Sequence, residues 1–319
     1  MNILLVGAGA VGQVYGYHLQ KGGARVSFFV RPKAAAARKD GMVLYALGTK
    51  GAREPIRFLA EDVFTSVDEV AKHAWDEVWF CVPADALDEA WLTSIAGAVG
   101  KARIIALPPG IASEQLIRRA FPESDVVPAL IGMVSYQAPL FGETLPEPGI
   151  AFYFQPGAPT AFGGPHGAEV AKELQRGGCP AVAKKDVAAS SAFGSAILMP
   201  VVAGLEAASW SLRGFRAGKV PALVARAARE AIAITAATLP ARAPLLVFLL
   251  TGTTLKLASW LAPKLAPFDL ERYLKHHFEK VGSQTRLLFR EYQKNGEAHG
   301  LESKALTSLL EHADHPGAP

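Results

Sequence analysis

The stretch ILLVGAGAVG, residues 3–12, decides how the first part of this chain folds. Four consecutive apolar residues, as in a strand buried on both faces, lead into three glycines, Gly7, Gly9 and Gly12. A helical stretch follows at once, and a second apolar run, RVSFFV, occupies residues 25–30. Glycines at this spacing permit a tight turn, close approach of a ligand to the backbone, and close packing of the helix on the sheet. We therefore predict strand, turn, helix and strand, with a phosphate-binding turn.

The pattern of strand and helix continues beyond this unit. Apolar runs at 78–82 and 103–107 predict two more parallel strands, so residues 1–184 are predicted to form an α/β Rossmann dinucleotide-binding domain. Residues 126–137 and 150–155 predict an antiparallel pair added to the edge of its sheet. The strand signal then disappears, and residues 185–319 are predicted to form an all-α domain for substrate binding and dimerisation. Its predicted helices are 187–212, 219–237, 244–260, 268–294 and 301–312.

Composition excludes several classes of protein. Half of the 319 residues are apolar, and 33 Lys and Arg against 29 Asp and Glu give a net charge of only +4, too little to indicate nucleic-acid binding. The basic excess lies in residues 185–319, with 16 basic and 11 acidic residues. Two cysteines form neither a disulfide framework nor a metal site. We expect no signal peptide, and the apolar stretch 244–263 is interpreted as a buried helix because polar residues interrupt it.

The predicted cofactor site lies around the glycine turn and the ends of the neighbouring strands. An acidic residue after the second strand would indicate NAD, but this chain has Arg31, whose guanidinium suits the 2′-phosphate of NADP. We therefore predict NADP as the cofactor. The residues assigned to its binding are Gly7, Ala8, Gly9, Ala10, Val11, Gly12, Arg31, Cys81, Val82, Pro83, Pro109 and Gly110.

Several segments together resemble one known family. They are GAGAVG (7–12), WFCVPA (79–84), LPPGIAS (107–113), SAILMPVVAGLEA (195–207) and VGSQTR (281–286). In order and spacing the chain resembles the ketopantoate reductases (2-dehydropantoate 2-reductases). The resemblance implies a Rossmann domain, a helical C-terminal domain and an active-site cleft between them.

The residues that the family uses for catalysis are replaced here. The resemblance implies a lysine at Pro83, an asparagine at Pro109, and a lysine and two asparagines at Ser191, Ser195 and Met199. Spacing by four residues puts the last three on one helix face, where they would bind substrate. Serine cannot supply the charge of a lysine to a developing alkoxide. The substrate expected is therefore a carbonyl or hydroxy compound other than ketopantoate.

A late helix offers replacements for the lost donors. Lys280 and Ser283 are predicted as the catalytic residues, Lys280 as the proton donor and Ser283 as the match to a serine of the family. Gln284 is predicted as a substrate-binding amide. Tyr273 lies on the same flank as Lys280 and is an alternative donor. In one continuous helix Ser283 would point away from the apolar stripe, and a break near Gly282 would reconcile that with the family pattern. The opposing interpretation is a solvated helix flank.

Three functions remain open at this point. The first is an NADP-dependent oxidoreductase acting on a carbonyl substrate; the second is an inactive NADP(H)-binding homologue; the third is a genuine 2-dehydropantoate 2-reductase with a rearranged site. We expect a cytoplasmic protein with a small-molecule carbonyl substrate, no bound metal, and no nucleic-acid or membrane partner. A homodimer is a further expectation, because the second domain is rich in apolar residues.

Overall fold

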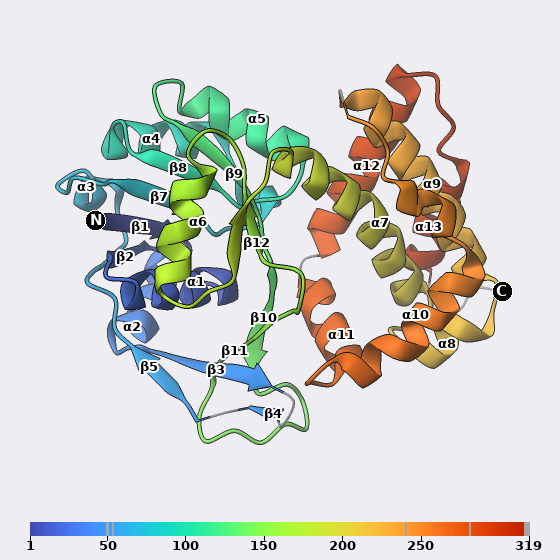
Figure 1. Cartoon of the computed structure of the whole chain (residues 1–319), viewed down its shortest axis with the longest axis horizontal. Coiled ribbons are helices and arrows are strands. Elements are labelled where there is room, and N and C mark those ends of the chain that lie inside the picture. Colours follow the sequence, from blue (N-terminus) through green and yellow to red (C-terminus); the bar gives the residue numbers. More distant parts are fainter. Residues whose placement is uncertain (49–50, 53, 240, 281, 316–319) are drawn as a thin grey trace. The chain divides into compact units, whose positions relative to one another are not determined.

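The computed structural model describes every residue except 49–50, 53, 240, 281 and 316–319. The chain forms two compact units, Met1–Ala188 and Ala189–Pro319. The first unit contains all the described strands, and the regular elements described in the second are all helices (Figure 1). An α/β Rossmann-like domain followed by an all-helical region is therefore confirmed. The roles assigned to the two domains, and the cleft expected between them, stay predictions.

An eight-stranded sheet forms the centre of the first unit. Its strands, in spatial order, are β13 (Ala181–Ala183), β12 (Thr160–Phe162), β9 (Val126–Leu130), β8 (Arg103–Ala106), β7 (Glu77–Phe80), β1 (Asn2–Val6), β2 (Arg25–Phe29) and β6 (Val63–Phe64). All neighbours are parallel except β9 and β12, which are antiparallel. The four apolar runs predicted as parallel strands are β1, β2, β7 and β8, and all four adjoin one another.

Successive residues of the central strands point to opposite faces of this sheet. Ile3 and Leu5 join a core with helices α1 (Ala10–Lys21) and α6 (Gly167–Arg176). Leu4 and Val6 join a second core on the other face. The helices of that face are α3 (Val67–Val70), α4 (Glu89–Val99) and α5 (Ile111–Ala120). Helices on both faces explain why these strands are apolar throughout.

A second sheet packs against the far side of α1. Its strands are β10 (Met133–Ala138), β11 (Gly149–Phe154), β3 (Met42–Gly48) and β4 (Gly51–Ala52), with β5 (Ile56–Phe58) paired to β3. The β10–β11 pair is antiparallel as predicted, but its predicted place at the edge of the main sheet is wrong. The chain changes sheets at Gly132, where an added Cβ would lie 2.2 Å from the backbone of Pro159 and Thr160. The predicted single strand 126–137 is therefore two strands.

Helices make up the second unit. They are α7 (Val187–Ala207, which begins in the first unit), α8 (Leu212–Ala217), α9 (Val220–Thr238), η2 (Leu245–Leu249, a 3₁₀ helix), α10 (Gly252–Leu265), α11 (Leu270–Lys280), α12 (Gly282–Ala298) and α13 (Lys304–Asp314). The single helix predicted over 268–294 is described as α11 and α12 on the two sides of residue 281, and because residue 281 lies outside the described residues, its continuity stays a prediction. The remaining connecting elements of the chain are α2 (Pro32–Lys39) and η1 (Ala84–Ala86) in the first unit.

Charged side chains distant in sequence fix the helices of this unit. Both oxygens of Glu230, on α9, accept backbone N–H groups at the start of α13, at 3.0 and 2.9 Å. Glu271, on α11, accepts the N–H of Leu212 at the start of α8, at 2.6 Å. Arg286 of α12 donates two hydrogen bonds to Glu206 of α7, at 2.6 and 2.9 Å. Since Glu206 and Arg286 belong to two of the motifs quoted above, the ion pair holds these motifs together.

The apolar stretch 244–263 does not form the buried helix that was predicted. It folds as η2 and α10, and α10 has no buried residue. A different helix, α7, is the one described helix long and apolar enough to cross a membrane by composition, and half of its apolar window is buried inside the protein. The core of the second unit includes Phe193 and Ala196 of α7, which identifies α7 as a core helix.

Candidate functional site

The turn between β1 and α1 is built from glycines that leave no room for side chains. Gly7 has a φ of +101°, and its N–H donates to the carbonyl oxygen of Phe29 at 2.9 Å. A Cβ on Gly7 would lie 2.9 Å from Val82 Cγ1, and one on Gly12 would lie 2.2 Å from the Gly7 oxygen. Two of the three glycines are therefore required by the turn itself.

The remaining glycine, Gly9, faces open space. It is exposed, its φ is −74°, and an added Cβ would meet no atom within 4 Å. Gly9 is the N-cap of α1 and supplies no side-chain hydrogen bond to the helix, whose first turn has no acidic residue. N–H groups at such a helix start bind anions. The turn, with Ala8 buried and Ala10 and Val11 half-buried, therefore fits a pyrophosphate that would occupy the space over Gly9.

Two residues support this turn that the sequence motif does not name. Gln13 is buried, and its Nε2 donates to the carbonyl oxygen of Ala8 at 2.9 Å, which braces the turn from inside. A Cβ on Gly16 would lie 2.7 Å from the ring of Phe28, so this fourth glycine lets α1 approach β2. Helical periodicity could have signalled both, since Gly12, Gln13 and Gly16 share the face of α1 that packs on the sheet.

Arg31 lies next to the turn at the same edge of the sheet. The register pairs Val6 of β1 with Phe29 of β2, so the chain after β2 lies beside the glycine turn. Arg31 and Lys33 are exposed at the start of α2. Both cations are thus available to an anion next to the turn, as a 2′-phosphate would require.

The loops after β7 and β8 complete this edge. Residues 79 and 80 of β7 pair with 5 and 6 of β1, so Cys81, Val82 and Pro83 follow beside Gly7. Cys81 is half-buried, and burial raises the pKa of its thiol, which fits packing rather than nucleophilic chemistry. Pro109 and Gly110 follow β8, and Gly110 has a φ of +99° and starts α5 without a side-chain cap. The structure therefore gathers all the predicted cofactor residues at the carboxyl ends of adjacent parallel strands, where ligands bind in such sheets.

The predicted substrate residues of α7 share one helix face but differ in exposure. Ser191 and Ser195 are half-buried, while Met199 is 6% exposed and belongs to the core of the second unit. Met199 therefore contacts the core with much of its surface. A substrate-binding role for the three residues stays a prediction.

Lys280 is the last described residue of α11, and Ser283 and Gln284 lie in the first turn of α12. Lys280 and Ser283 are exposed and Gln284 is half-buried. The alternative donor, Tyr273, stacks against His277 with ring centroids 5.4 Å apart, and burial raises its pKa to about 12. A phenol with that pKa stays protonated at neutral pH. Catalysis by Lys280 and Ser283 stays a prediction.

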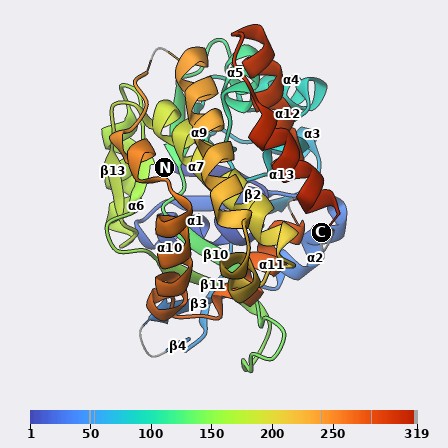
Figure 2. The ribbon, with the colours of Figure 1, turned by 90° about the vertical axis from the view of Figure 1, so that its right-hand side faces the viewer.

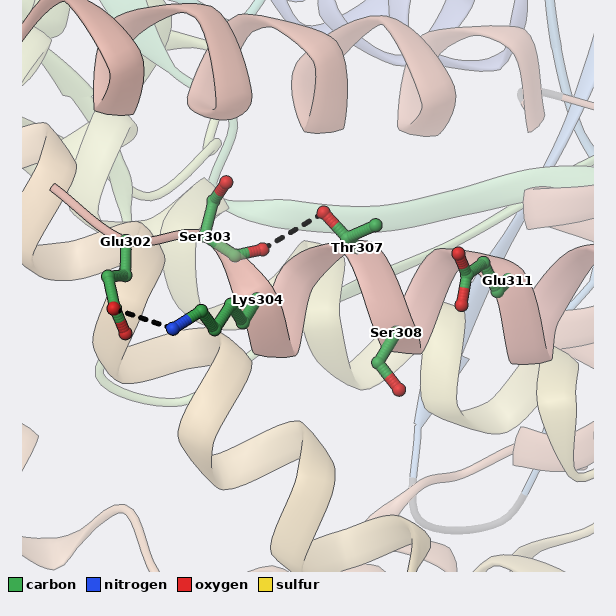
Figure 3. Close-up of a pocket in the computed structure, with 6 residues that line it drawn as sticks. All are labelled: Glu302, Ser303, Lys304, Thr307, Ser308 and Glu311. Atoms are coloured by element: carbon green, nitrogen blue, oxygen red, sulfur yellow. Dashed lines mark hydrogen bonds and ion pairs between the residues drawn. The ribbon is translucent and has the colours of Figure 1, made fainter.

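A surface depression on the second unit is a poor substrate site. It has a volume of about 420 Å³ and is lined by the polar side chains of Glu302, Ser303, Lys304, Thr307, Ser308 and Glu311 (Figure 3). Its cation, Lys304, is paired to Glu302 at 2.7 Å. Substrate pockets are mostly apolar and concave, so this one does not compete with the glycine turn. Among the described residues, no group of three or more His, Cys, Asp or Glu could hold a metal ion.

A charged cluster lies at the amino ends of strands β7 and β8, away from the glycine turn. Glu77 is 1% exposed, and it accepts hydrogen bonds from Trp79 at 2.8 Å and Arg103 at 3.1 Å. Arg103 also pairs with Glu169 of α6 at 2.8 Å. The carboxyl of Glu173, one turn along α6, contacts Glu77, and burial together with that neighbour raises the pKa of Glu173 to about 7. The cluster lies at the amino ends of β7 and β8, whereas the glycine turn lies at the carboxyl ends of the parallel strands. We therefore assign the cluster a structural role.

A family model describes most of the first unit. Residues 3–142 match the model of ketopantoate reductase PanE/ApbA. The match contains the glycine turn, Arg31 and both loops that follow β7 and β8. The resemblance to ketopantoate reductases expected from the sequence is therefore confirmed. No curated protein sequence matches the chain significantly.

Solved structures share the fold of the whole chain. A PanE/ApbA family ketopantoate reductase from Ralstonia eutropha JMP134 superimposes with a TM-score of 0.72 at 21% identity, over 98% of this chain and 97% of the other. A ternary structure of D-mandelate dehydrogenase with NADH and anilino(oxo)acetate gives 0.75 at 15% identity, over 98% and 97%. The 2-dehydropantoate 2-reductase from Methylococcus capsulatus gives 0.68 at 19%, over 98% and 95%. At these identities the likeness shows the fold, and these relatives are named as reductases and dehydrogenases.

Proposed function

We propose that this chain is a cytoplasmic NADP-dependent oxidoreductase that interconverts a carbonyl and a hydroxy compound other than ketopantoate. The observation that carries the proposal is the glycine turn, where an uncapped helix start faces the open space over Gly9. The family match over residues 3–142 and the NADH-bound neighbour of the same fold support a nicotinamide dinucleotide as the ligand.

Arg31 supports NADP over NAD. It is exposed beside the turn, where an acidic residue would otherwise accept hydrogen bonds from a ribose 2′-hydroxyl. A guanidinium can donate two hydrogen bonds to a phosphate and adds a favourable charge. Lys33, exposed two residues later, adds a second cation.

Each group of residues has a separate task in this proposal. The N–H groups at the start of α1 bind the pyrophosphate, and the loops after β7 and β8 hold the cofactor at the sheet edge. The bound nicotinamide supplies or accepts the hydride. Reduction puts negative charge on the carbonyl oxygen, and Lys280 donates the proton to that oxygen while Ser283 and Gln284 orient the substrate. Ser191 and Ser195 replace charged groups, which favours a less anionic substrate than ketopantoate.

Cofactor binding is tested with two variants of the turn region. Gly9→Ala places a methyl group where the phosphate would lie, and since its φ is −74° and the space is open, the fold should be unaffected. We expect it to lose NADPH binding while its melting temperature is unchanged. Gly97→Ala in α4, which also meets no atom within 4 Å, is the matched control and should bind normally.

Cofactor choice is tested by titration of Arg31→Ala with NADPH and NADH. Loss of a charge-assisted contact to phosphate costs about 1.5–3 kcal/mol, so NADPH should bind roughly 10- to 100-fold more weakly and NADH about as before. An equal loss for both nucleotides would contradict the assignment to the 2′-phosphate.

Turnover is tested with NADPH and a panel of 2-keto acids, ketones and aldehydes that includes ketopantoate. Lys280→Met should lower kcat about 100-fold or more, as loss of a general acid does. Lys275→Met, one exposed lysine earlier on α11, should not change kcat. A preference for ketopantoate would show that the substrate proposal is wrong. Tight NADPH binding without turnover of any compound would favour the inactive homologue.

A further inference from the structure

The second unit exposes a row of large apolar side chains along η2 and α10. Leu245, Phe248 and Leu249 of η2 and Leu257, Trp260 and Leu265 of α10 are between 49% and 82% exposed. We call these six residues the apolar face. Leu257, Trp260 and Leu265 are spaced by three and five residues and lie on one side of α10.

The opposite side of the same segment is anchored in the protein. Val247, Leu250 and Leu255 pack on the core of the second unit. Arg216 of α8 donates to the carbonyl oxygen of Ser259 at 2.9 Å, and a Cβ on Gly252 would lie 3.2 Å from Ala222 of α9. Figure 2 shows α10 beside α9 on the side turned toward the viewer. The apolar face is thus held outward by a segment that is fixed on its inner side.

The exposed apolar area of this face is larger than a few scattered apolar residues would give. Side chains of this size have roughly 150–250 Å² each, so the six leave on the order of 600 Å² of apolar surface in water. That reaches the upper end of the largest patch on a typical monomer, roughly 300–600 Å², and patches of this size mark interaction sites.

Exposed cations lie on and next to the segment that carries the apolar face. Residues 206–271 contain eight lysines and arginines against four acidic residues, Glu206, Glu230, Asp269 and Glu271. Glu206 pairs with Arg286, and Glu271 accepts the N–H of Leu212. The carboxylate of Glu230 is occupied by the N–H groups of α13. Arg213 of α8 and Lys219 at the start of α9 are exposed, as are Lys256 and Lys264 of α10. Lys264 Nζ lies 3.2 Å from the centre of the Trp260 ring, so a cation stands at the apolar face itself.

We propose that the apolar face docks on the surface of a lipid bilayer that carries anionic headgroups. Aromatic and leucine side chains on one side of a helix, with lysine and arginine around them, are the features of helices that lie in the membrane interface. A helix of 14 residues is too short to span a bilayer, which needs about 20. Such a contact would place the protein at a membrane surface, and it does not depend on the proposed activity. It departs from the expectation that the chain has no membrane partner.

Charge disfavours the main alternative, a second copy of this chain. A twofold dimer places the same patch on both sides, so Lys256 and Lys264 of one copy would face those of the other. An acidic protein would also match the charge of this region. The apolar side chains project outward from one segment, however, and a deformable lipid surface can take up such projecting side chains.

The proposal is tested with the full chain and vesicles of phosphatidylcholine alone or with about one-third phosphatidylglycerol. Flotation should recover the protein with the anionic vesicles only, and raised salt should release it. Lys256→Gln with Lys264→Gln should weaken binding about thirtyfold, about fivefold for each charge. Trp260→Ser should weaken it about tenfold or more, because its ring no longer enters the lipid.

Matched controls come from the first unit, and NADPH binding with the melting temperature confirms that each variant is folded. Lys101→Gln removes a lysine that is 80% exposed, and Leu59→Ser removes a leucine that is 60% exposed; neither should change flotation. Equal binding to neutral vesicles, or no binding to either kind, overturns the proposal. If light scattering shows a dimer that Trp260→Ser dissociates, with no vesicle binding, the face belongs to a second copy and the proposal is wrong.

Discussion

Glu173 and Glu77 give the first unit a pH dependence that a single substitution should remove. The pKa of Glu173 is raised to about 7, because its carboxyl is partly buried and lies against Glu77, while an unfolded chain would titrate it near 4.5. A raised pKa means that folding favours the protonated form. The contribution of Glu173 to stability is therefore full below pH 4.5 and is lost as the pH rises through 7.

The size of this effect follows from the difference between the two values. About 2.5 pH units correspond to about 3.4 kcal/mol. Because the side chain is only partly buried, solvent screening reduces this to about half, roughly 1.5–2 kcal/mol. Glu173→Gln keeps the shape and can donate to Glu77 as the protonated acid does, but it never ionises. The variant should therefore lie within about 0.5 kcal/mol of the parent at pH 5 and be more stable by about 1.5–2 kcal/mol at pH 8.

Thermal melts followed by circular dichroism at pH 5 and pH 8 measure this difference. At about 2–4 °C per kcal/mol for a unit of this size, Glu173→Gln should melt about 3–8 °C above the parent at pH 8. Glu169→Gln, one turn earlier on the same helix, is the control and should give no gain, because hydrogen bonding by His166 and the charge of Arg103 lower the pKa of Glu169. The reasoning would be refuted if Glu173→Gln melted below the parent at pH 8. It would also be refuted if the difference in melting temperature between variant and parent were the same at pH 5 and pH 8.

Three further changes test other features. Gly12→Ala should destabilise the protein by about 1–3 kcal/mol in urea melts, since its Cβ would lie 2.2 Å from a carbonyl oxygen; stability equal to the parent would contradict the account of the turn. Arg286→Met should cost about 2–3 kcal/mol by leaving Glu206 unpaired in a partly buried position, whereas Arg290→Met, exposed on the same helix, should stay within about 0.5 kcal/mol. Burial, with the charges of Lys280 and His276, lowers the pKa of His277 to about 4, so stability is lost as the pH falls from 6.5 toward 4; His277→Phe should raise stability at pH 5 and leave it unchanged at pH 7.5 in denaturant titrations.

Local signals in the sequence identified the centre of the main sheet. A strand buried on both faces is apolar at every position, and the glycines after β1 follow from short-range sterics that any window of ten residues contains. The order of strands around β1 then follows from the rules for parallel connections. The predicted cofactor residues gather at one edge for the same reason.

The second sheet could not be predicted in this way. Its strand β3 pairs with β11, which lies more than 100 residues further along the chain, and such pairing leaves no local pattern. Gly132 marks the change of sheet, but only the backbone of Pro159 and Thr160 explains why a glycine is needed there. Gln13 is an equally tertiary feature, because its partner is a carbonyl inside the turn.

Residues 244–263 show a different limit of sequence reasoning. Their apolar character predicts burial, yet Leu245 and Phe248 are 82% and 77% exposed. Hydrophobicity measures the free energy that a side chain gains when it leaves water. The apolar environment that it enters can be the core of the protein or the surface of a partner.

The distant caps of the second unit set an order for its completion during synthesis. Helix α8 leaves the ribosome well before Glu271, which holds its first N–H group, and Glu230 leaves long before the start of α13 that it binds. Neither pair can form until the last third of the chain has been translated, whereas the strands around the glycine turn already have their partners. The first unit can therefore fold while the second is still being made, and a ribosome that stops before residue 304 would release a protein with a formed nucleotide-binding turn and an incomplete helical unit.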